Sequence, residues 1–191
     1  MKKVIITAVT VAVIAALGYS LFVTFRSGAN EKGIISCPSE ENCIWTAHIH
    51  AYIPIELCGE DYRLPIEVGP LTGPHTHEEK NVAHWHDQLP YAVTTKLITD
   101  TKPLTLGAFF DAISVPFGTG LIGEYRDGNL CSNQKSGSLK VFINGEIASD
   151  YRDYIWQNRD VIQIFFDERS AEQTRLFVEE HPVSFPALGR G

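Results

Sequence analysis

The hydrophobic pattern of the chain opens with one long apolar run, residues 4–25. As a helix rising about 1.5 Å per residue, this run would measure about 33 Å, enough to cross a bilayer core of about 30 Å. Lys2 and Lys3 precede the run and only Arg26 follows it, a bias that places the following body outside the cytoplasm. The run exceeds the ~7–15 apolar residues typical of a signal peptide, which favours an uncleaved transmembrane anchor over a cleaved signal peptide.

Beyond this run the pattern becomes that of strands. Residues 44–57 alternate between apolar and polar positions and are rich in β-branched and aromatic side chains, which predicts a strand or a pair of strands. Pro54 has no backbone N–H, so it favours a break or an edge position. Residues 62–68 predict a short second strand after a hairpin around residues 59–61, and residues 69–74 predict turns.

Two segments of the C-terminal half have helical patterns. Residues 105–113 predict a short helix, because a threonine that can cap its N-terminus precedes an apolar face. Residues 171–180 predict a second helix, because Ser170 and Gln173 form a capping-box pattern before it.

Strand patterns lie between these helices. Residues 139–143 and 161–166 predict strands, and Asn144-Gly145 is a strong hairpin signal. Strands with interspersed short helices predict an α+β fold, with one mixed or antiparallel sheet domain after the N-terminal transmembrane helix. The order of elements from residue 104 to residue 166 is similar to one half of a β-grasp fold.

The length of 191 residues allows one domain of ordinary size. The composition shifts along the chain predict four parts: a transmembrane anchor at 1–26, a linker at 27–43, a histidine-rich domain at 44–168, and a C-terminal helix and tail at 169–191.

The net charge of the body restricts the classes of partner that it can bind. The chain has 16 positive and 23 negative side chains, and no acid precedes residue 27. Without Lys2, Lys3 and Arg26 the body therefore has 13 positive and 23 negative charges, a net charge of −10. Such an acidic body is a poor partner for nucleic acid or anionic lipid, which require basic patches, but it attracts cations.

The four cysteines all lie in the exported part, and their number is even. An oxidising compartment predicts two disulfides, for which three connectivities are open. Cys37 and Cys43 could close a short loop, and Cys58 with Cys131 would tie the two halves of the body together. Thiolate ligation of a metal is the alternative, but no C-x-x-C pair is present.

Six of the seven histidines occur as H-x-H pairs within residues 48–86. On a strand, residues i and i+2 lie on the same face, roughly 6.5–7 Å apart, so that two imidazoles can converge on one ion with bonds of ~2.0–2.1 Å. The alternative to metal binding is that hydrogen bonds hold these histidines on a polar face of the sheet, or that they form a pH-responsive cluster. The predicted metal ligands are His48, His50, His75, His77, His84 and His86.

The types of ligand side chain restrict which metal ions the site could bind. Imidazoles with nearby carboxylates suit zinc, copper, iron or nickel and do not favour calcium or magnesium, and zinc(II) and copper(II) are the leading candidates. The only methionine is Met1, which argues against a thioether copper site. Glu78, Glu79 and Asp87 adjoin the histidine pairs and are candidates for ligands, partners of an imidazole N–H or general bases.

Several motifs together resemble a largely uncharacterised family of exported prokaryotic proteins. The family pattern has an early H-x-H, then HTHD-x-x-G-I-I-H-x-E, then TLG-x-FFD and a V-x-V-N-G hairpin. This chain has HTHEEKNVAHWH at 75–86, TLGAFFD at 105–111 and VFING at 141–145, and the resemblance extends over roughly residues 45–166. It implies His48, His50, His75, His77 and His84 as shared positions.

The chain departs from that pattern at three positions. Glu78 replaces the usual Asp, Asn81 replaces the usual Gly, and His86 stands where the family has Glu. Asn also tolerates a left-handed turn, so the second change is conservative for the backbone. The third change replaces a carboxylate with an imidazole, which is compatible with metal ligation but not with catalysis that depends on this Glu.

These features predict a membrane-anchored, extracytoplasmic transition-metal-binding protein that holds zinc or copper. Two other functions remain open. A three-histidine zinc site that keeps a position for water could make the chain a lyase or a hydrolase. The sheet surface could instead contact another envelope protein as a structural or interaction module.

Overall fold

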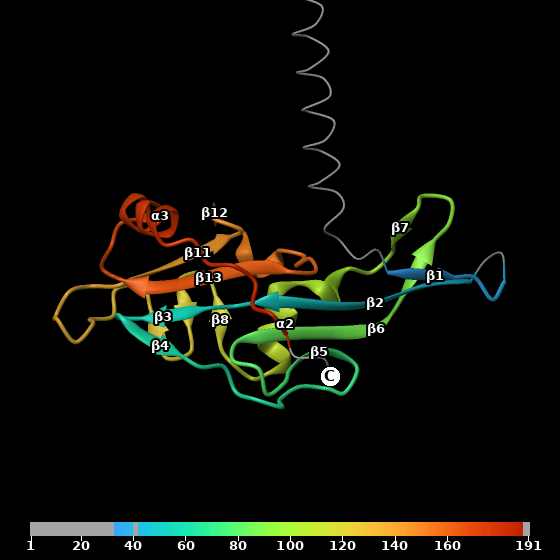
Figure 1. Ribbon diagram of the computed structural model, residues 1–191, viewed down its shortest axis with the longest axis horizontal. Coiled ribbons are helices and arrows are strands. Elements are labelled where there is room, and N and C mark those ends of the chain that lie inside the picture. Colours follow the sequence, from blue (N-terminus) through green and yellow to red (C-terminus); the bar gives the residue numbers. More distant parts are fainter. Residues whose placement is uncertain (1–32, 40–41, 189–191) are drawn as a thin grey trace, which may run out of the picture. The chain divides into compact units, whose positions relative to one another are not determined.

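Two long antiparallel strands, β2 (Cys43–Tyr52) and β6 (Val82–Ala92), run side by side through the middle of the fold (Figure 1). The structure, a computed structural model, describes residues 33–39 and 42–188. The two strands pair without interruption, from Cys43 opposite Tyr91 to Tyr52 opposite Val82. Side chains two residues apart on either strand therefore lie next to one another on one face.

The other strands extend this pair into a ten-stranded sheet with the order β12-β11-β13-β2-β6-β5. At its margins β1 pairs with β2, β3 with β13 and β4, and β7 with β6. A second sheet has three short strands in the order β10-β9-β8. The remaining strands are β1 (Ile34–Ser36), β3 (Ile55–Leu57), β4 (Glu60–Tyr62), β5 (Gly73–Thr76), β7 (Leu97–Ile98), β8 (Phe117–Gly118), β9 (Leu121–Ile122), β10 (Tyr125–Arg126), β11 (Ser138–Ile143), β12 (Glu146–Ala148) and β13 (Asp160–Asp167).

The predicted break at Pro54 is confirmed. The chain leaves β2 at Tyr52 and resumes pairing in β3, and both strands lie parallel to β13. The carbonyl oxygen of Pro54 accepts a hydrogen bond from Ile164 N (2.9 Å), so the break lies against β13 even though Pro54 has no N–H to donate. All eight residues of β13 are buried, which makes this strand the centre of the sheet.

Alternation along β2 and β6 divides the two faces of the sheet. Ala47, Ile49 and Ala51 of β2 are buried on the core side, and Trp85 of β6 is 0% exposed there. Trp85 also stacks on Trp45, with ring centroids 5.6 Å apart. The residues between these positions face the other way and include the histidines.

Helix α2 (Leu106–Ala112) closes the core side of the sheet. Thr105 caps it by accepting a hydrogen bond from Ala108 N, as the sequence predicts. Phe109 and Phe110 are 0% exposed and belong to the same buried cluster as Ile49 and Trp85. The short 3-10 helices η1 (Lys102–Leu104) and η2 (Tyr151–Asp153) lie next to α2.

Helix α3 (Ala171–Glu180) covers the opposite side of the sheet, near β11 and β13 (Figure 1). Its bounds agree with the predicted helix, and Ser170 and Gln173 form both hydrogen bonds of the capping box. Phe177 and Val178 pack against Phe142 of β11 and Phe165 of β13 in a second, smaller cluster.

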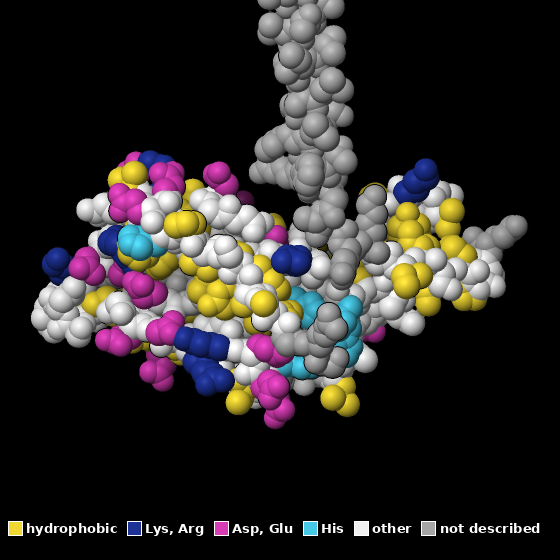
Figure 2. Space-filling model, viewed as in Figure 1, with side chains coloured by type: hydrophobic (Ala, Val, Ile, Leu, Met, Phe, Trp, Pro, Cys, Tyr) yellow, Lys and Arg dark blue, Asp and Glu magenta, His cyan; other side chains and the backbone are white. Residues whose placement is uncertain are grey.

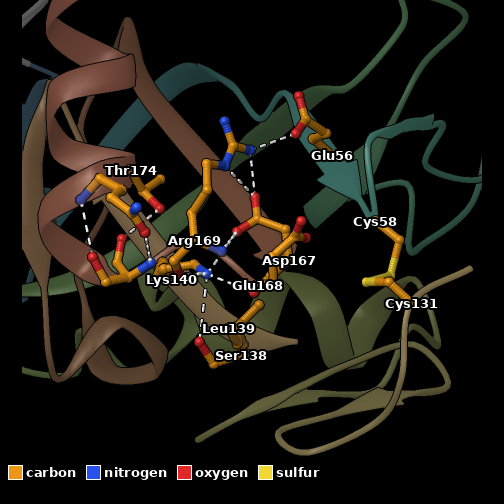
Figure 3. Close-up of polar contacts among 12 residues, drawn as sticks. Glu56, Cys58, Cys131, Ser138, Leu139, Lys140, Asp167, Glu168, Arg169 and Thr174 are labelled. Atoms are coloured by element: carbon orange, nitrogen blue, oxygen red, sulfur yellow. Dashed lines mark hydrogen bonds and ion pairs between the residues drawn. A yellow bond between two sulfur atoms is a disulfide. The ribbon is translucent and has the colours of Figure 1, made fainter. Parts of the chain in front are cut away.

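A buried ion pair fixes the chain where β13 leads into α3 (Figure 3). The ammonium group of Lys140 donates to Asp167 Oδ1 (2.8 Å) and to the carbonyl oxygen of Arg169 (2.8 Å). Arg169 Nη2 in turn contacts Glu56 of β3 at 2.5 Å. Burial alone would raise the pKa of Asp167, but hydrogen bonds from Arg169 and Lys140 outweigh it and hold this pKa below its usual value.

Both expected disulfides are present, and the structure selects one of the three open connectivities. Cys37 pairs with Cys43 across six residues. Cys58 pairs with Cys131 across 73 residues and joins the β3–β4 turn to the loop before β11 (Figure 3). All four cysteines of the chain are therefore oxidised, which removes thiolate ligation from the candidate metal chemistry.

The predicted α+β fold class is wrong. Strands take up 41% of the described residues and helices only 15%. The expected helices do form, but α2 and α3 have only 7 and 10 residues. Residues 117–126, for which the sequence shows no strand pattern, pair as β8, β9 and β10, because three two-residue strands are too short to produce a detectable alternation. The fold is predominantly β-sheet, with two short helices packed on it.

The predicted single-pass membrane location is also corrected. The anchor expected at residues 1–26 lies outside the described residues. Within residues 33–39 and 42–188, no helix is long and apolar enough to cross a membrane.

Candidate metal centre

Three neighbouring strands bring the paired histidines to one face of the sheet. In the ladder between β2 and β6, His48 lies opposite His86 and His50 lies opposite His84. On the other side of β6, His75 of β5 lies opposite His84. Figure 2 shows histidine side chains gathered in one surface patch, in the region where Figure 1 draws β2, β6 and β5. The pairs on β2 and β6 thus lie on one face with His75 of β5, and the strand register joins these histidines into one cluster.

The cluster contains sets of three side chains whose ligand atoms all lie within 4.8 Å of one another. We call the set His48, His50 and His84 the first triplet, and the set His75, His77 and His86 the second triplet. A third set combines His77 and His84 with Glu79. The structure thus shows histidine clusters that could hold a metal ion.

The rings of the two triplets are in close contact. Within the first triplet, the ring centroids of His50 and His84 are 4.0 Å apart and those of His48 and His50 are 4.5 Å apart. Within the second, His75 and His86 are 4.7 Å apart. Between the triplets, the His77 and His84 rings stack with centroids 4.0 Å apart.

His84 lies at the centre of the cluster. The residue is only 6% exposed, and neither ring nitrogen, Nδ1 or Nε2, has a hydrogen-bond partner. Burial, reinforced by the neighbouring His50 and His77 rings, lowers the pKa of His84 to about 2. His84 is therefore a neutral imidazole at pH 7, with a nitrogen lone pair available to a metal.

His75 is held in one orientation by its own strand. Its Nδ1–H donates to the carbonyl oxygen of Gly73 (2.9 Å), so Nε2 carries the lone pair and points to His77 Nε2 (2.8 Å). Burial is the main cause that lowers the pKa of His75, and the nearby rings, His86 foremost, add to it, whereas the Gly73 hydrogen bond opposes the shift. A backbone carbonyl that fixes the tautomer of an imidazole is a common support for a metal ligand.

The backbone around His75 is clamped by the preceding loop. Thr76 donates its hydroxyl to the carbonyl oxygen of Pro65 (2.7 Å) and accepts from Val68 N (3.1 Å). Gly69 has φ +115°, and a Cβ at this position would lie 2.7 Å from His75 Cβ. Only glycine fits such a close approach, so the loop can lie directly against the strand that carries His75.

Asn81 shapes the turn between the second and third histidine pairs. It has φ 56°, the left-handed conformation for which the sequence identifies Asn as suitable, and it is only 2% exposed. Its side chain accepts from Leu64 N (2.8 Å) and donates to the carbonyl oxygen of Tyr62 (2.8 Å). Its own carbonyl oxygen accepts from Ile53 N (2.7 Å). One residue therefore connects this turn to the loop after β4 and to the end of β2.

We expect Asn81→Ala to lower the free energy of unfolding by about 2 kcal/mol, because two buried hydrogen-bonding groups lose their partners and alanine disfavours positive φ. Asn81→Gly is the matched control, because glycine loses the same side-chain bonds but keeps the backbone conformation without strain. Urea unfolding of both variants measures the difference. If Asn81→Gly were as destabilised as Asn81→Ala, the left-handed conformation would not contribute.

Two residues far away in the sequence hold His50. Asn158 Oδ1 accepts a hydrogen bond from His50 N (3.0 Å), and Arg159 N donates to the carbonyl oxygen of His50 (2.7 Å). The sequence marks this segment only as a turn before the last strand. No local signal could have indicated the role, because the contact between Asn158 and His50 spans 108 positions.

The three candidate acids have different positions. Glu79 belongs to a ligand set, and its Oε2 is buried without a hydrogen-bond partner. Glu78 is exposed, and its carbonyl oxygen lies 3.5 Å from Arg63 Nη2. Asp87 follows His86 on β6, so it faces away from the histidines, and its Oδ1 accepts from Gln88 N (2.7 Å). Of the three, only Glu79 is placed to take part in the cluster.

Trp85 and His181 lie outside the histidine cluster. Trp85, between His84 and His86, points into the core, as alternation predicts. His181 ends α3, where its Nδ1 lies 3.0 Å from the carbonyl oxygen of Phe177 and its ring stacks on the Phe177 ring.

Comparison of the chain with protein-family models, with curated proteins and with solved structures gives no match.

Proposed function

We propose that this protein binds transition-metal ions, zinc or copper, through the imidazoles on the β2, β6 and β5 face. The observation that carries the proposal is the pair of triplets, in which six imidazoles lie within ligand distance of their set partners. Five of them lie on β2, β5 and β6, and His77 directly follows β5. His84 adds a second argument. A buried imidazole with two unpartnered nitrogens lowers the free energy of unfolding, and binding a metal would offset that loss.

The donor chemistry favours zinc(II) or copper(II). The cluster offers imidazole nitrogens with one carboxylate, a set that suits borderline metals and not calcium or magnesium. No cysteine thiolate is available as a ligand, because all four cysteines are in disulfides. The only methionine, and so the only thioether, is Met1. A soft copper(I) site built on sulfur is therefore incompatible with this chain.

The disulfides support an oxidising compartment for the body. Two disulfides persist where thiols are not kept reduced, as outside the cytoplasm. We therefore place the proposed metal binding in such a compartment, where the function would be to store, deliver or sense the ion.

The test is metal analysis of the full chain purified without a histidine tag. Zinc and copper(II) are each added in excess, unbound ion is removed by gel filtration, and bound metal is counted by mass spectrometry. We expect stoichiometric binding that EDTA reverses, and a melting temperature that rises with bound metal because only the folded state offers the site. His181→Gln should bind as the parent protein does. Absence of bound zinc and copper in the folded parent protein would refute the proposal.

A zinc-dependent hydrolase or lyase is the second candidate, and Glu79 is the observation in its favour. A three-imidazole zinc site leaves a fourth position for water, and the Glu79 carboxylate adjoins His77 and His84, where it would act as the proton acceptor. Ester hydrolysis and hydration assays on the zinc-loaded protein separate the two functions. Turnover that Glu79→Gln abolishes, while zinc remains bound, would favour the enzyme.

A further inference from the structure

We infer that the cluster holds two metal ions at once, one in each triplet, with the Glu79 carboxylate at the junction between them. This inference rests on the proposed metal-binding function and specifies its stoichiometry and its bridging group. Four features of the described residues carry it: the size of the ligand sets, the division of the six imidazoles between them, the contact between the triplets, and the position of Glu79.

The first feature is the size of the sets. Two nitrogens bound to one zinc or copper ion at ~2.0–2.1 Å can be no more than about 4.2 Å apart. Within the described part of the chain, every set whose ligand atoms lie within 4.8 Å of one another has three members, and none has four. A single ion therefore cannot collect most of the six imidazoles in their present side-chain positions.

The second feature is the division of the imidazoles. The first and second triplets share no residue, and together they use all six histidines of the H-x-H pairs. The third set takes His84 from the first triplet and His77 from the second, so it competes with both. With two ions, one in each triplet, every imidazole binds one ion and none is shared.

The third feature is the contact between the triplets. His77 and His84 belong to different triplets, and their ring centroids are 4.0 Å apart. His48 and His86 also belong to different triplets and are 5.5 Å apart. The two ions would therefore be neighbours, as in two-metal sites that act on one ligand together.

The Glu79 carboxylate is positioned to bind both ions. Its carboxylate lies within 4.8 Å of the ligand atoms of His77 and His84, one residue from each triplet, and its Oε2 is buried with no partner. Two adjacent dications surrounded by neutral imidazoles repel each other, and an anion between them reduces that repulsion. A carboxylate, which has two oxygens, can bind both ions at once.

The test begins with the ion count of the full chain. Zinc and copper(II) are titrated separately by equilibrium dialysis, and bound metal is measured per chain. We expect two ions. One ion would overturn this inference and leave the proposed function intact, whereas no bound ion would refute both.

Paired variants then assign the ions. His48→Gln with His50→Gln should reduce the count from two to one, and His75→Gln with His77→Gln should do the same. His181→Gln is the control and should keep two. Circular dichroism checks that each variant folds, and the parent count remains decisive if one does not. A folded double variant that still holds two ions, or that holds none, would contradict separate triplets.

Copper(II) electron paramagnetic resonance tests the adjacency and the role of Glu79. Neighbouring copper(II) ions couple, so the signal of the two-ion protein should be broadened or should integrate to fewer spins than copper atoms. Glu79→Gln should weaken binding of the second ion about tenfold or more, because it removes the charge between the sites. Two uncoupled ions in the parent protein, or unchanged affinity for the second ion in Glu79→Gln, would overturn the shared junction.

Discussion

Replacing His84 with leucine is expected to stabilise the metal-free protein by about 2 kcal/mol at pH 7, because both imidazole nitrogens are buried without hydrogen-bond partners. Leucine has a similar volume and no polar atoms to desolvate. Most substitutions of buried residues destabilise, so a gain at this position would mark a residue kept for function and not for folding.

The gain should increase as the pH falls. Burial, reinforced by neighbouring rings, lowers the pKa of His84 from 6.5 to about 2. Below pH 6.5 the unfolded chain binds a proton at His84 that the folded chain does not bind, so the free energy of unfolding decreases with acidification by up to about 1.4 kcal/mol per pH unit. The leucine variant lacks this contribution. Its advantage over the parent protein should therefore reach about 4 kcal/mol at pH 5.

Urea unfolding of the metal-free proteins between pH 7.5 and pH 5 measures both parts of this prediction. The same variant should bind one ion fewer, because the first triplet loses a member. His181→Leu, at the exposed end of α3, is the matched control and should change neither the metal count nor the pH dependence. Parallel stability curves for His84→Leu and the parent protein would show that the buried imidazole carries no pH-dependent cost.

Loss of the Cys58–Cys131 disulfide is expected to lower the free energy of unfolding by about 4 kcal/mol. In the chain-entropy account, a cross-link stabilises by restricting the unfolded chain, and the effect grows with the length of the closed loop. This disulfide closes 73 positions, whereas Cys37–Cys43 closes only six. The shorter disulfide should therefore contribute less, about 2 kcal/mol.

The paired experiment replaces both cysteines of one disulfide with alanine and leaves the other intact. Chemical denaturation of the two double variants gives the comparison, and the shorter loop acts as the control for removing two sulfur atoms. A larger loss at Cys37 and Cys43 than at Cys58 and Cys131 would contradict the loop-length explanation.

Local patterns predicted the elements that depend on neighbouring residues. The capping box at Ser170 and the apolar face that follows it defined α3, and Thr105 marked the start of α2. The break at Pro54 was predictable because proline has no N–H to donate. The fold class was not predictable from such patterns, because the short strands β8, β9 and β10 are defined by their partners and not by their own alternation.

By itself, the sequence predicted that His48 and His50 share one face of a strand, because residues 44–57 have a strand pattern and side chains alternate with a period of two residues. It did not determine which pairs meet. Only the register of β2, β6 and β5 brings His50, His84 and His75 into one row across three strands. The tertiary structure also decided that Glu79, and not Glu78 or Asp87, joins the cluster and that Asn158 supports His50. Strand register depends on contacts between residues far apart in the chain, whereas alternation is a property of each strand alone.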